Sequence, residues 1–346
     1  MAFKGNFMSF MDSEPHDRVP IYLFDVTLGM EAAGIDTDVI YVNGFDGEKS
    51  ARSLLALQRY LGYDAVNGST SWFDNRVFGN DIVFPKKGIP YHGKYCLSNP
   101  SNLYNLDHSS IPGKLLDQLA LSHRLVREGT DAALVTHVPS PLGAAVGLRG
   151  LEYVIMDMLR DSDYVRDMLD FCVETIRIVT ERVFEDVHPD MGLISGANDN
   201  VGLIGTDGIR DVSTPYAGKV IKLLSKGCGK VCFHPHGELH LYPEILKGYE
   251  SIGVQVLYYG DSCEPLEIHR TIPDMPLMGG IDTFTTLTLG DERRVISDTE
   301  RYVRMMDGIN YCFSCSCSVD RGLSLEYVKA MVDTVRRVGK YDVHRS

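Results

Sequence analysis

Short apolar runs alternate with amphipathic segments along most of the chain. Eight runs are rich in β-branched or aromatic residues, as buried strands are, and most segments between them have apolar residues at helical spacing. Such alternation with nearly continuous apolar strands is typical of a parallel sheet buried on both faces. The predicted strands are residues 18–25, 64–70, 132–139, 191–199, 229–237, 254–261, 276–282 and 310–317, and the predicted helices are 49–62, 114–129, 165–187, 216–227, 241–253, 292–308 and 323–339.

Eight strand–helix units predict an α/β fold of the closed (β/α)8 barrel type, a TIM barrel. Eight strands close around an interior that side chains can just fill, and no glycine-rich phosphate motif favours an open sheet. Residues from about 71 to 112 break the rhythm with turn residues and short alternating runs. We interpret them as an inserted β-hairpin after the second strand, lying over one barrel mouth. Residues 1–346 are therefore predicted to form a single barrel domain.

Composition and charge narrow the classes of partner. The chain has 346 residues, of which 44% are hydrophobic and 23% charged, as in ordinary globular proteins. Its formal net charge of −13 repels nucleic acids and anionic lipid surfaces, so neither is expected as a partner. No apolar run reaches the length of a membrane span, and the first residues lack the apolar stretch of a signal peptide, which predicts a cytoplasmic protein. Small molecules and proteins remain as partners.

Polar side chains gather at the predicted strand ends, where barrels of this kind place their chemistry. Two glycines before the end of the seventh strand, Gly279 and Gly280, indicate close backbone approach. The polar residues at these ends are Asp25, Thr27, Asn67, Ser69, His137, Asn198, Asp199, His234, His236, Asp261, Cys263, Asp282, Cys315 and Cys317.

Histidine and cysteine residues at these ends predict a metal site. Residues two apart on a strand share a face, so His234 and His236 can present both imidazoles to one ion. The same spacing relates Cys315 and Cys317 on the last strand, and Cys263 follows the sixth. Such nitrogen and sulfur ligands suit Zn²⁺ and would leave one coordination position open. In the alternative interpretation, the two histidines fill a polar barrel end without a metal.

Several segments resemble the uroporphyrinogen decarboxylase superfamily, and specifically its corrinoid- and zinc-dependent methyltransferase branch. The resemblance covers nearly the whole chain, and members of the superfamily are (β/α)8 barrels. It rests on HDRVPIYLFD, HVPSPLGAAVGLRGLEYVIMDMLRDSDYVRDML, KVCFHPHGELH, MGGIDTFTTLTLG and CSVDRGLSLEYVKAMVDTVRRVGKY.

The decarboxylase itself is disfavoured. Its N-terminal segment, close to MRQAGRY, uses arginines to hold the carboxylates of the porphyrinogen substrate, whereas this chain has LFDVTLGMEAAG in that region. Without those cations, a polycarboxylate would meet a strongly acidic protein with little to neutralise it.

The methyltransferase branch carries His-x-Cys-Gly on the fifth strand and a later Cys, which bind zinc. His234 and Cys317 match the first and last of these ligands, whereas His236 stands where the branch usually has Cys. Replacing a thiolate by a neutral imidazole removes a negative charge and makes the zinc a stronger Lewis acid. This difference favours an enzyme that takes a methyl group from a small methylated substrate, such as a methoxylated aromatic compound undergoing O-demethylation.

The resemblance also implies a corrinoid (cobalamin) as the methyl carrier. The chain lacks a corrinoid-binding D-x-H-x-x-G motif, so the cofactor is expected on a separate corrinoid-binding protein that docks over the rim. Transfer from the corrinoid to a thiol such as coenzyme M remains an alternative if Cys263 is also a ligand. A non-enzymatic ligand-binding barrel and a zinc hydrolase are further alternatives.

Other residues are candidates for supporting roles. Asp199, Asp25 and His137 are candidates for proton transfer, and Asp282 is a candidate for orienting a zinc-bound histidine. Each is equally consistent with an ordinary rim residue that hydrogen-bonds a loop. Aromatic residues in the insertion are candidates for the wall of an aromatic substrate site, although a lid packed on itself explains them equally well. They are Trp72, Phe73, Tyr91, Tyr95 and Tyr104.

Overall fold

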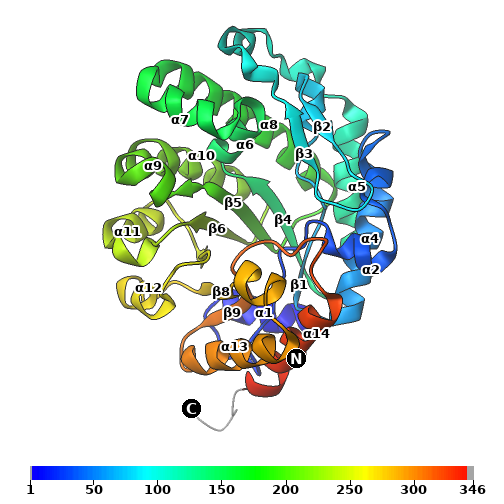
Figure 1. Ribbon diagram of the computed structural model, residues 1–346, viewed down its shortest axis with the longest axis vertical. Helices are drawn as coiled ribbons and strands as arrows, with labels where there is room; N and C mark the ends of the chain where they lie inside the picture. The colour runs from blue at the N-terminus through cyan, green and yellow to red at the C-terminus, as the bar shows by residue number, and fades with distance from the viewer. Residues whose placement is uncertain (1, 341–346) are drawn as a thin grey trace.

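Seven parallel strands form the central sheet of the computed structural model, which describes residues 2–340 (Figure 1). Neighbouring strands follow one another in sequence, apart from the inserted hairpin, so each crossover brings the chain to the adjacent strand. In order across the sheet, the strands are β1 (Ala65–Asn67), β4 (Ala133–Pro139), β5 (Met191–Asn200), β6 (Lys230–His236), β7 (Val256–Tyr258), β8 (Leu277–Ile281) and β9 (Tyr311–Cys315).

Residues 18–25 connect the two edge strands of this sheet. Ile21 forms a parallel bridge to Phe313 of β9, and Tyr22 forms one to Ala65 of β1. The Tyr22 amide donates to the Phe313 carbonyl at 3.0 Å. The predicted (β/α)8 barrel is confirmed, but its first strand is present only as isolated bridges. Pro20 has no amide hydrogen and so interrupts the regular ladder.

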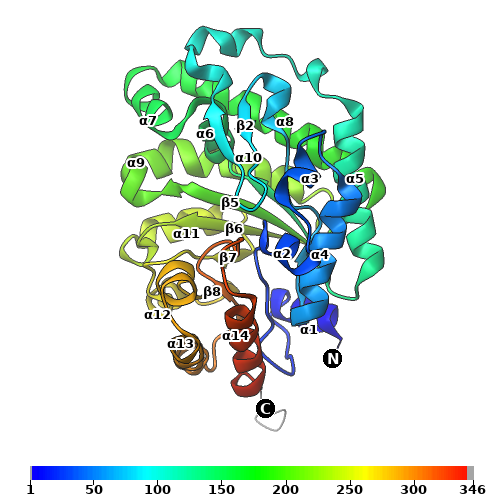
Figure 2. The same ribbon diagram turned by 45° about the vertical axis from the view of Figure 1, so that its right-hand side comes forward.

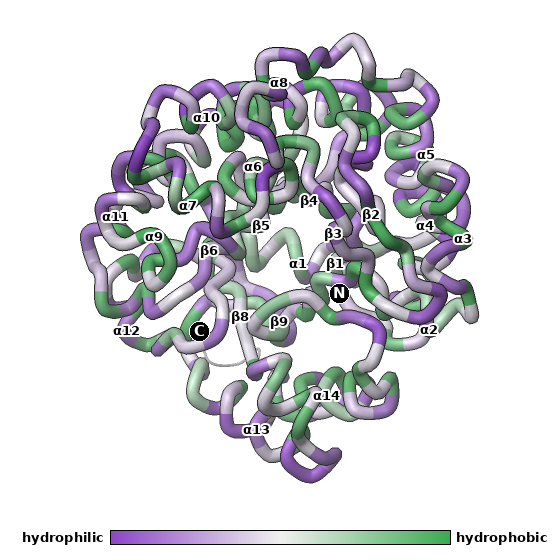
Figure 3. The backbone as a smooth tube through the Cα atoms, turned by 45° about the horizontal axis from the view of Figure 1, so that its top comes forward, coloured by the Kyte–Doolittle hydropathy of each residue, from purple (hydrophilic) through white to green (hydrophobic). Residues whose placement is uncertain are grey.

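The helices lie outside the sheet, and each predicted helix is confirmed to within a few residues (Figure 2). Along the outer helices α5 and α14, hydrophobic and hydrophilic stretches alternate, as expected for helices with one buried face (Figure 3). No helix within residues 2–340 combines the length and apolar character needed to cross a membrane. The helices are α1 (Phe3–Met11), α2 (Leu28–Ala33), α3 (Thr37–Tyr41), α4 (Gly47–Leu61), α5 (Gly113–Gly129), α6 (Pro141–Arg149), α7 (Leu151–Arg160), α8 (Ser162–Asp186), α9 (Val201–Gly208), α10 (Thr214–Leu224), α11 (Pro243–Ser251), α12 (Pro265–Thr271), α13 (Glu292–Met305) and α14 (Leu325–Val338).

The predicted insertion after the second strand of the barrel is confirmed. Between β1 and β4, the strands β2 (Asp81–Val83) and β3 (Tyr91–Lys94) form an antiparallel hairpin. Short 3-10 helices complete the segment, which lies beside β4 and α5 (Figure 1). Its apolar residues, including Phe78 and Leu97, pack in one cluster with residues of α6 and α8. The insertion is thus fixed to the barrel wall by apolar packing.

Side chains alternate between two cores along the strands. Cys232 of β6 joins an interior cluster that draws on every strand of the central sheet, whereas Val231 and Phe233 pack outward against the helices. On β9, Cys312 joins the interior cluster and Phe313 faces outward. Phe7 and Phe10 of α1 also belong to the interior cluster. The parity of a residue along each strand therefore decides whether its side chain faces the inside of the barrel.

A buried ion pair fixes residues 18–25 to β1. The Asp64 side chain is fully buried and accepts two hydrogen bonds from the Arg18 guanidinium, at 2.8 and 2.5 Å. It also accepts from the Ile21 amide at 2.8 Å. Burial raises the pKa of Asp64, although Arg18 opposes this rise. Removal of Arg18 would leave a buried carboxylate without its charge partner, which costs several kcal/mol.

We predict that Arg18→Met lowers the free energy of unfolding by about 3 kcal/mol at pH 8, measured by urea denaturation. Without Arg18, which opposes the rise, the pKa of Asp64 is higher in the variant than in the unsubstituted protein. Protonation of Asp64 at low pH therefore stabilises the folded variant more, and this contribution is lost as the pH rises. The deficit should therefore be smaller at pH 5 than at pH 8. Arg59→Met, at an exposed position of α4, serves as the control and should change stability by less than about 0.5 kcal/mol. An equal effect of the two substitutions would contradict this assignment.

Candidate metal centre

Three of the predicted metal ligands come together at the mouth of the barrel. One ligand atom from each of His234, His236 and Cys317 lies within 4.8 Å of the other two. The two histidines lie at the end of β6, two and four residues after Cys232, whose side chain faces the inside of the barrel, so their side chains face the inside as well. Cys317 follows the end of β9. The group therefore lies at the carboxyl ends of the strands, where enzymes of this architecture carry their active sites.

Outside the pair, each imidazole has its polar partner at Nδ1, and the two Nε2 atoms face each other. Nδ1 of His234 donates to the Tyr258 carbonyl at 2.7 Å. Nδ1 of His236 faces Oδ1 of Asp261 at 3.5 Å. The two Nε2 atoms then lie 3.2 Å apart. Two nitrogens bound to a tetrahedral zinc at its usual bond length would be about 3.3 Å apart, so the donor pair fits zinc.

The protonation states also fit a metal. Burial, followed by the neighbouring His236, lowers the pKa of His234 well below its usual value. Burial likewise lowers the pKa of His236, although Asp261 opposes this shift. Both imidazoles are then neutral at pH 7, as metal binding requires. Burial raises the pKa of the Cys317 thiol, and a bound divalent cation would favour its thiolate.

Tyr258 and Asp261 hold the group in place, and neither role was predicted from the sequence. The Tyr258 ring stacks on His234 with centroids 3.8 Å apart, and its hydroxyl donates to the Cys315 carbonyl at 2.9 Å. One side chain thus connects β6 to the chain that leads into Cys317. Asp261 stands at a predicted strand end, which was the only sequence signal for it.

Cys315 and Cys263 lie apart from the three-residue group. Cys315 shares the outward parity of Phe313, and its Sγ lies 3.8 Å from Sδ of Met331 on α14. The prediction that Cys315 and Cys317 share a face was wrong, because β9 ends at Cys315 and the alternation stops there. The Cys263 thiol donates to the Gly237 carbonyl at 3.1 Å.

Asp282 does not contact the histidines through any hydrogen bond or ion pair found among the described residues. Its Oδ1 accepts from the Thr285 amide at the start of a short π-helix, residues Thr283–Thr288. The prediction that the backbone of a neighbouring strand comes close to the glycines before Asp282 is confirmed. A Cβ atom on Gly280 would lie only 1.8 Å from the Ser314 carbonyl oxygen. Asp282 caps a helix, and the carboxylate next to a histidine is that of Asp261.

The two buried aspartates proposed for proton transfer form local hydrogen bonds. Asp199 is fully buried, and its two carboxylate oxygens accept from the hydroxyls of Ser140 and Ser213. These contacts connect β5 to the start of α6 and to the end of a π-helix, Ile209–Ser213, that leads into α10. The Asp25 carboxylate accepts from the Gly29 amide at 3.0 Å, and burial raises its pKa to about 7. A carboxyl group with this pKa holds a proton at neutral pH in part of the molecules.

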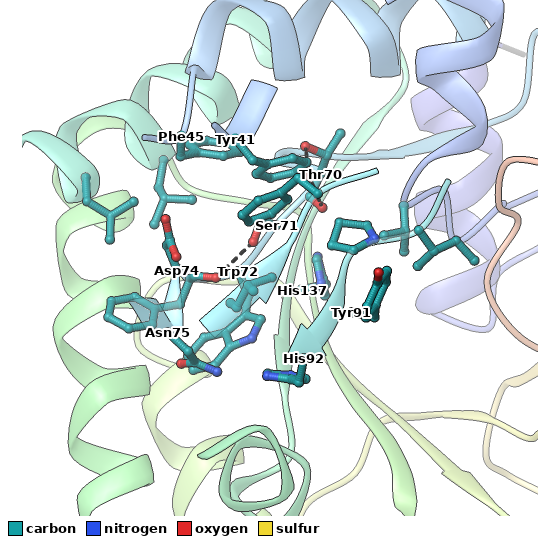
Figure 4. A pocket seen from close by; sticks show the side chains of 18 residues that line it. Tyr41, Phe45, Thr70, Ser71, Trp72, Asp74, Asn75, Tyr91, His92 and His137 are labelled. Atoms are coloured by element: carbon teal, nitrogen blue, oxygen red, sulfur yellow. Dashed lines mark hydrogen bonds between the residues drawn. The ribbon is translucent and has the colours of Figure 1, made fainter. Parts of the chain in front are cut away.

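His137 lies in a cavity between the hairpin and the barrel mouth, together with most of the predicted aromatic wall (Figure 4). Burial lowers the pKa of His137 to about 4. Trp72 and Tyr91 also line the cavity, as does Phe73. The other two predicted wall residues, Tyr95 and Tyr104, do not line the cavity. The Tyr95 ring stacks on His92, and the hydroxyl of the exposed Tyr104 donates a hydrogen bond to Asp167.

Comparison with known proteins identifies the same fold in solved structures. A methyltransferase from Methanosarcina mazei superposes with a TM-score of 0.80 at 19% sequence identity, covering 97% of this chain and 99% of the other. A B12-independent methionine synthase from Shewanella sp. W3-18-1, in complex with selenomethionine, superposes with a TM-score of 0.53 at 13% identity, covering 85% of this chain and 86% of the other. No curated protein matches the sequence. The family model of uroporphyrinogen decarboxylase (URO-D) matches residues 3–338, and the chain therefore belongs to this family.

Proposed function

We propose that the protein is a zinc-dependent methyltransferase that passes a methyl group from a small methylated substrate to the cobalt of a separate corrinoid protein. A methoxylated aromatic compound is the favoured donor, and the reaction is then an O-demethylation. The proposal is carried by the His234, His236 and Cys317 group at the barrel mouth. The similarity of the fold to a methyltransferase from Methanosarcina mazei is consistent with it.

The composition of the ligand set supports transfer from the substrate rather than to a thiol. Two neutral imidazoles and one thiolate leave more positive charge on a zinc ion than a set with two thiolates does. A zinc ion held there would act as a Lewis acid that polarises the heteroatom carrying the methyl group. The thiol-methylating alternative requires Cys263 as a second thiolate, whereas the Cys263 thiol donates a hydrogen bond to the Gly237 carbonyl and lies outside the group of three ligands.

The surrounding residues supply orientation and proton handling. The Tyr258 carbonyl and the Asp261 carboxylate fix the imidazoles so that both Nε2 atoms face the same point. Among the three candidates for proton transfer, Asp25 is favoured, because its pKa of about 7 suits a general acid at neutral pH. The carboxylate oxygens of Asp199 are both occupied by serine hydroxyls, which favours a structural role.

The corrinoid partner would dock over the carboxyl ends of the strands, because the three proposed metal ligands lie there.

We also propose the cytoplasm as the location. All eight cysteines are free in the structure, and thiols persist in that state in a reducing compartment.

The zinc content of the purified protein tests the proposed ligands. The purified protein should hold about one zinc per chain, measured by metal analysis, because three ligands converge on one point. Cys317→Ser should lose most of this zinc, since a hydroxyl is a much poorer ligand than a thiolate. Cys263→Ser is the matched control and should retain it. A Cys317→Ser protein that binds zinc as well as the unsubstituted protein would refute the ligand set.

The carboxylate beside His236 gives a further prediction about zinc affinity. Asp261→Asn should weaken zinc affinity by about 10- to 100-fold in a chelator competition, because the carboxylate orients His236. Asp282→Asn places the same change at the neighbouring strand end and should leave zinc affinity unchanged. The reverse pattern would restore the assignment of Asp282 as the partner of a ligand.

The reaction itself is tested with cobalamin. Enzyme, cob(I)alamin and a series of methyl ethers are mixed, and formation of the methyl–cobalt bond is followed by visible spectroscopy. We expect methylation by at least one methoxylated aromatic compound, and none with His234→Ala. If the protein holds zinc and no methoxy, methylamine or methylthio compound methylates cobalt, the proposed function is wrong.

A further inference from the structure

The cavity lined by His137 contains none of the three proposed metal ligands, His234, His236 and Cys317, so the metal site does not account for it. It has a volume of about 240 Å³ and lies between the hairpin, the segment after β1 and the end of β4. We propose that it binds the ring of an uncharged, single-ring aromatic compound. This inference rests on the proposed function in one respect only, namely that the bound compound is the methyl donor.

The walls of the cavity are built from aromatic rings on several elements. Tyr41 and Phe45 lie at one end and Trp72 at the other, while Tyr91 and His92 come from the hairpin (Figure 4). A cavity of about 150 Å³ in a protein core holds benzene. The volume here is therefore enough for one six-membered ring with small substituents, but it is small for a multi-ring ligand.

The cavity lies close to the metal ligands. The Phe24 ring makes edge contacts with the rings of both His137 and His234, at centroid distances of 5.2 and 6.4 Å. His137 lines the cavity, and His234 belongs to the ligand group. Phe24 therefore connects a residue of the cavity wall to a residue of the metal group, which places the cavity next to the proposed metal site.

The cavity offers no cation to a negatively charged ring. Among the described residues that line it there is no Lys or Arg, and Asp74 is the sole carboxylate. Asp74 is paired at 2.6 Å with Arg76, which lies outside the lining and also donates to the Tyr41 carbonyl at 2.5 Å. Burial lowers the pKa values of His92 and His137, so both rings are neutral at pH 7.

The hydroxyl groups of Tyr41, Thr70 and Ser71 in the wall already donate to other protein groups. The Tyr41 hydroxyl donates to Thr70 Oγ1 at 2.9 Å, and Ser71 Oγ donates to the Phe73 carbonyl at 3.0 Å. A ring carboxylate would therefore lose hydration without gaining a cation from the lining, which is costly. The chain as a whole carries a charge of −13, which adds to this penalty. These features select methoxyphenols over methoxybenzoates.

The chain contains a built-in reporter for the test. Trp72 is its only tryptophan, so any change of tryptophan fluorescence reports on this cavity. The full-length protein, without corrinoid, is titrated at pH 7 with 2-methoxyphenol and with 2-methoxybenzoate, and the affinities are checked by calorimetry. We expect 2-methoxyphenol to change the fluorescence and to bind at least about tenfold more tightly, a difference of about 1.4 kcal/mol.

A charge introduced at the cavity tests the selectivity. Ile89 lines the cavity and is 49% exposed, so Ile89→Arg can be accommodated without disturbing the core. It should tighten 2-methoxybenzoate binding by about tenfold, the effect of one charge-assisted hydrogen bond. Val39 on α3 is also 49% exposed but lies outside the lining, so Val39→Arg is the matched control with the same change in net charge. It should leave both affinities unchanged.

The outcomes separate this inference from the proposed function. The inference about the cavity is overturned if 2-methoxybenzoate binds the unsubstituted protein as tightly as 2-methoxyphenol. It is also overturned if neither compound changes the Trp72 fluorescence while cobalt is still methylated. An equal gain in 2-methoxybenzoate affinity from Ile89→Arg and Val39→Arg also contradicts it. Binding of 2-methoxyphenol in the cavity supports the inference, and if no methoxylated compound then methylates cobalt, only the proposed function fails.

Discussion

The arrangement of the candidate site depends on the alternation of side chains along β6. Cys232 lies in the interior cluster, so the residues two and four positions later also face the inside of the barrel. His234 and His236 therefore emerge together at the mouth, with their Nε2 atoms 3.2 Å apart. A shift of one residue in the pairing of this strand would turn both imidazoles toward the helices and remove the group.

The neighbouring strands then complete what β6 begins. β7 and the residues after it contribute the Tyr258 carbonyl and the Asp261 carboxylate, which hold the outer nitrogens of the two imidazoles. The loop after β9 brings Cys317 to the same point, and the Tyr258 hydroxyl binds the chain just before it at the Cys315 carbonyl. Three strands thus determine the ligand geometry, and the buried aspartates nearby fix the wall around it. Asp199 does so through two serines, and Asp25 through the first turn of α2.

The insertion after β1 adds a cavity to the barrel mouth, to which we assign substrate binding. Its hairpin and the preceding aromatic segment line a cavity together with His137 of β4, and the Phe24 ring contacts both His137 and His234. Under the proposed function, the β6 and β9 ends would supply the metal ligands, and the insertion would select the compound that is bound. A division of this kind is common in barrels, where the scaffold is constant and loops differ.

Periodicity alone was enough to predict the barrel, its outer helices and the position of the hairpin, because each depends on local hydrophobic spacing that the chain displays directly. Parity along β6 likewise predicted that His234 and His236 share a face, and the family resemblance selected Cys317 from the cysteines that spacing had made candidates. Three features required the tertiary structure. Cys315 faces Met331 because β9 ends there, a boundary that spacing does not reveal. Asp261, and not Asp282, meets a histidine because the choice between two strand ends depends on how the loops fold in space. The cavity joins residues from β4, the hairpin and the segments around them, and such contacts are decided by packing between distant parts of the chain.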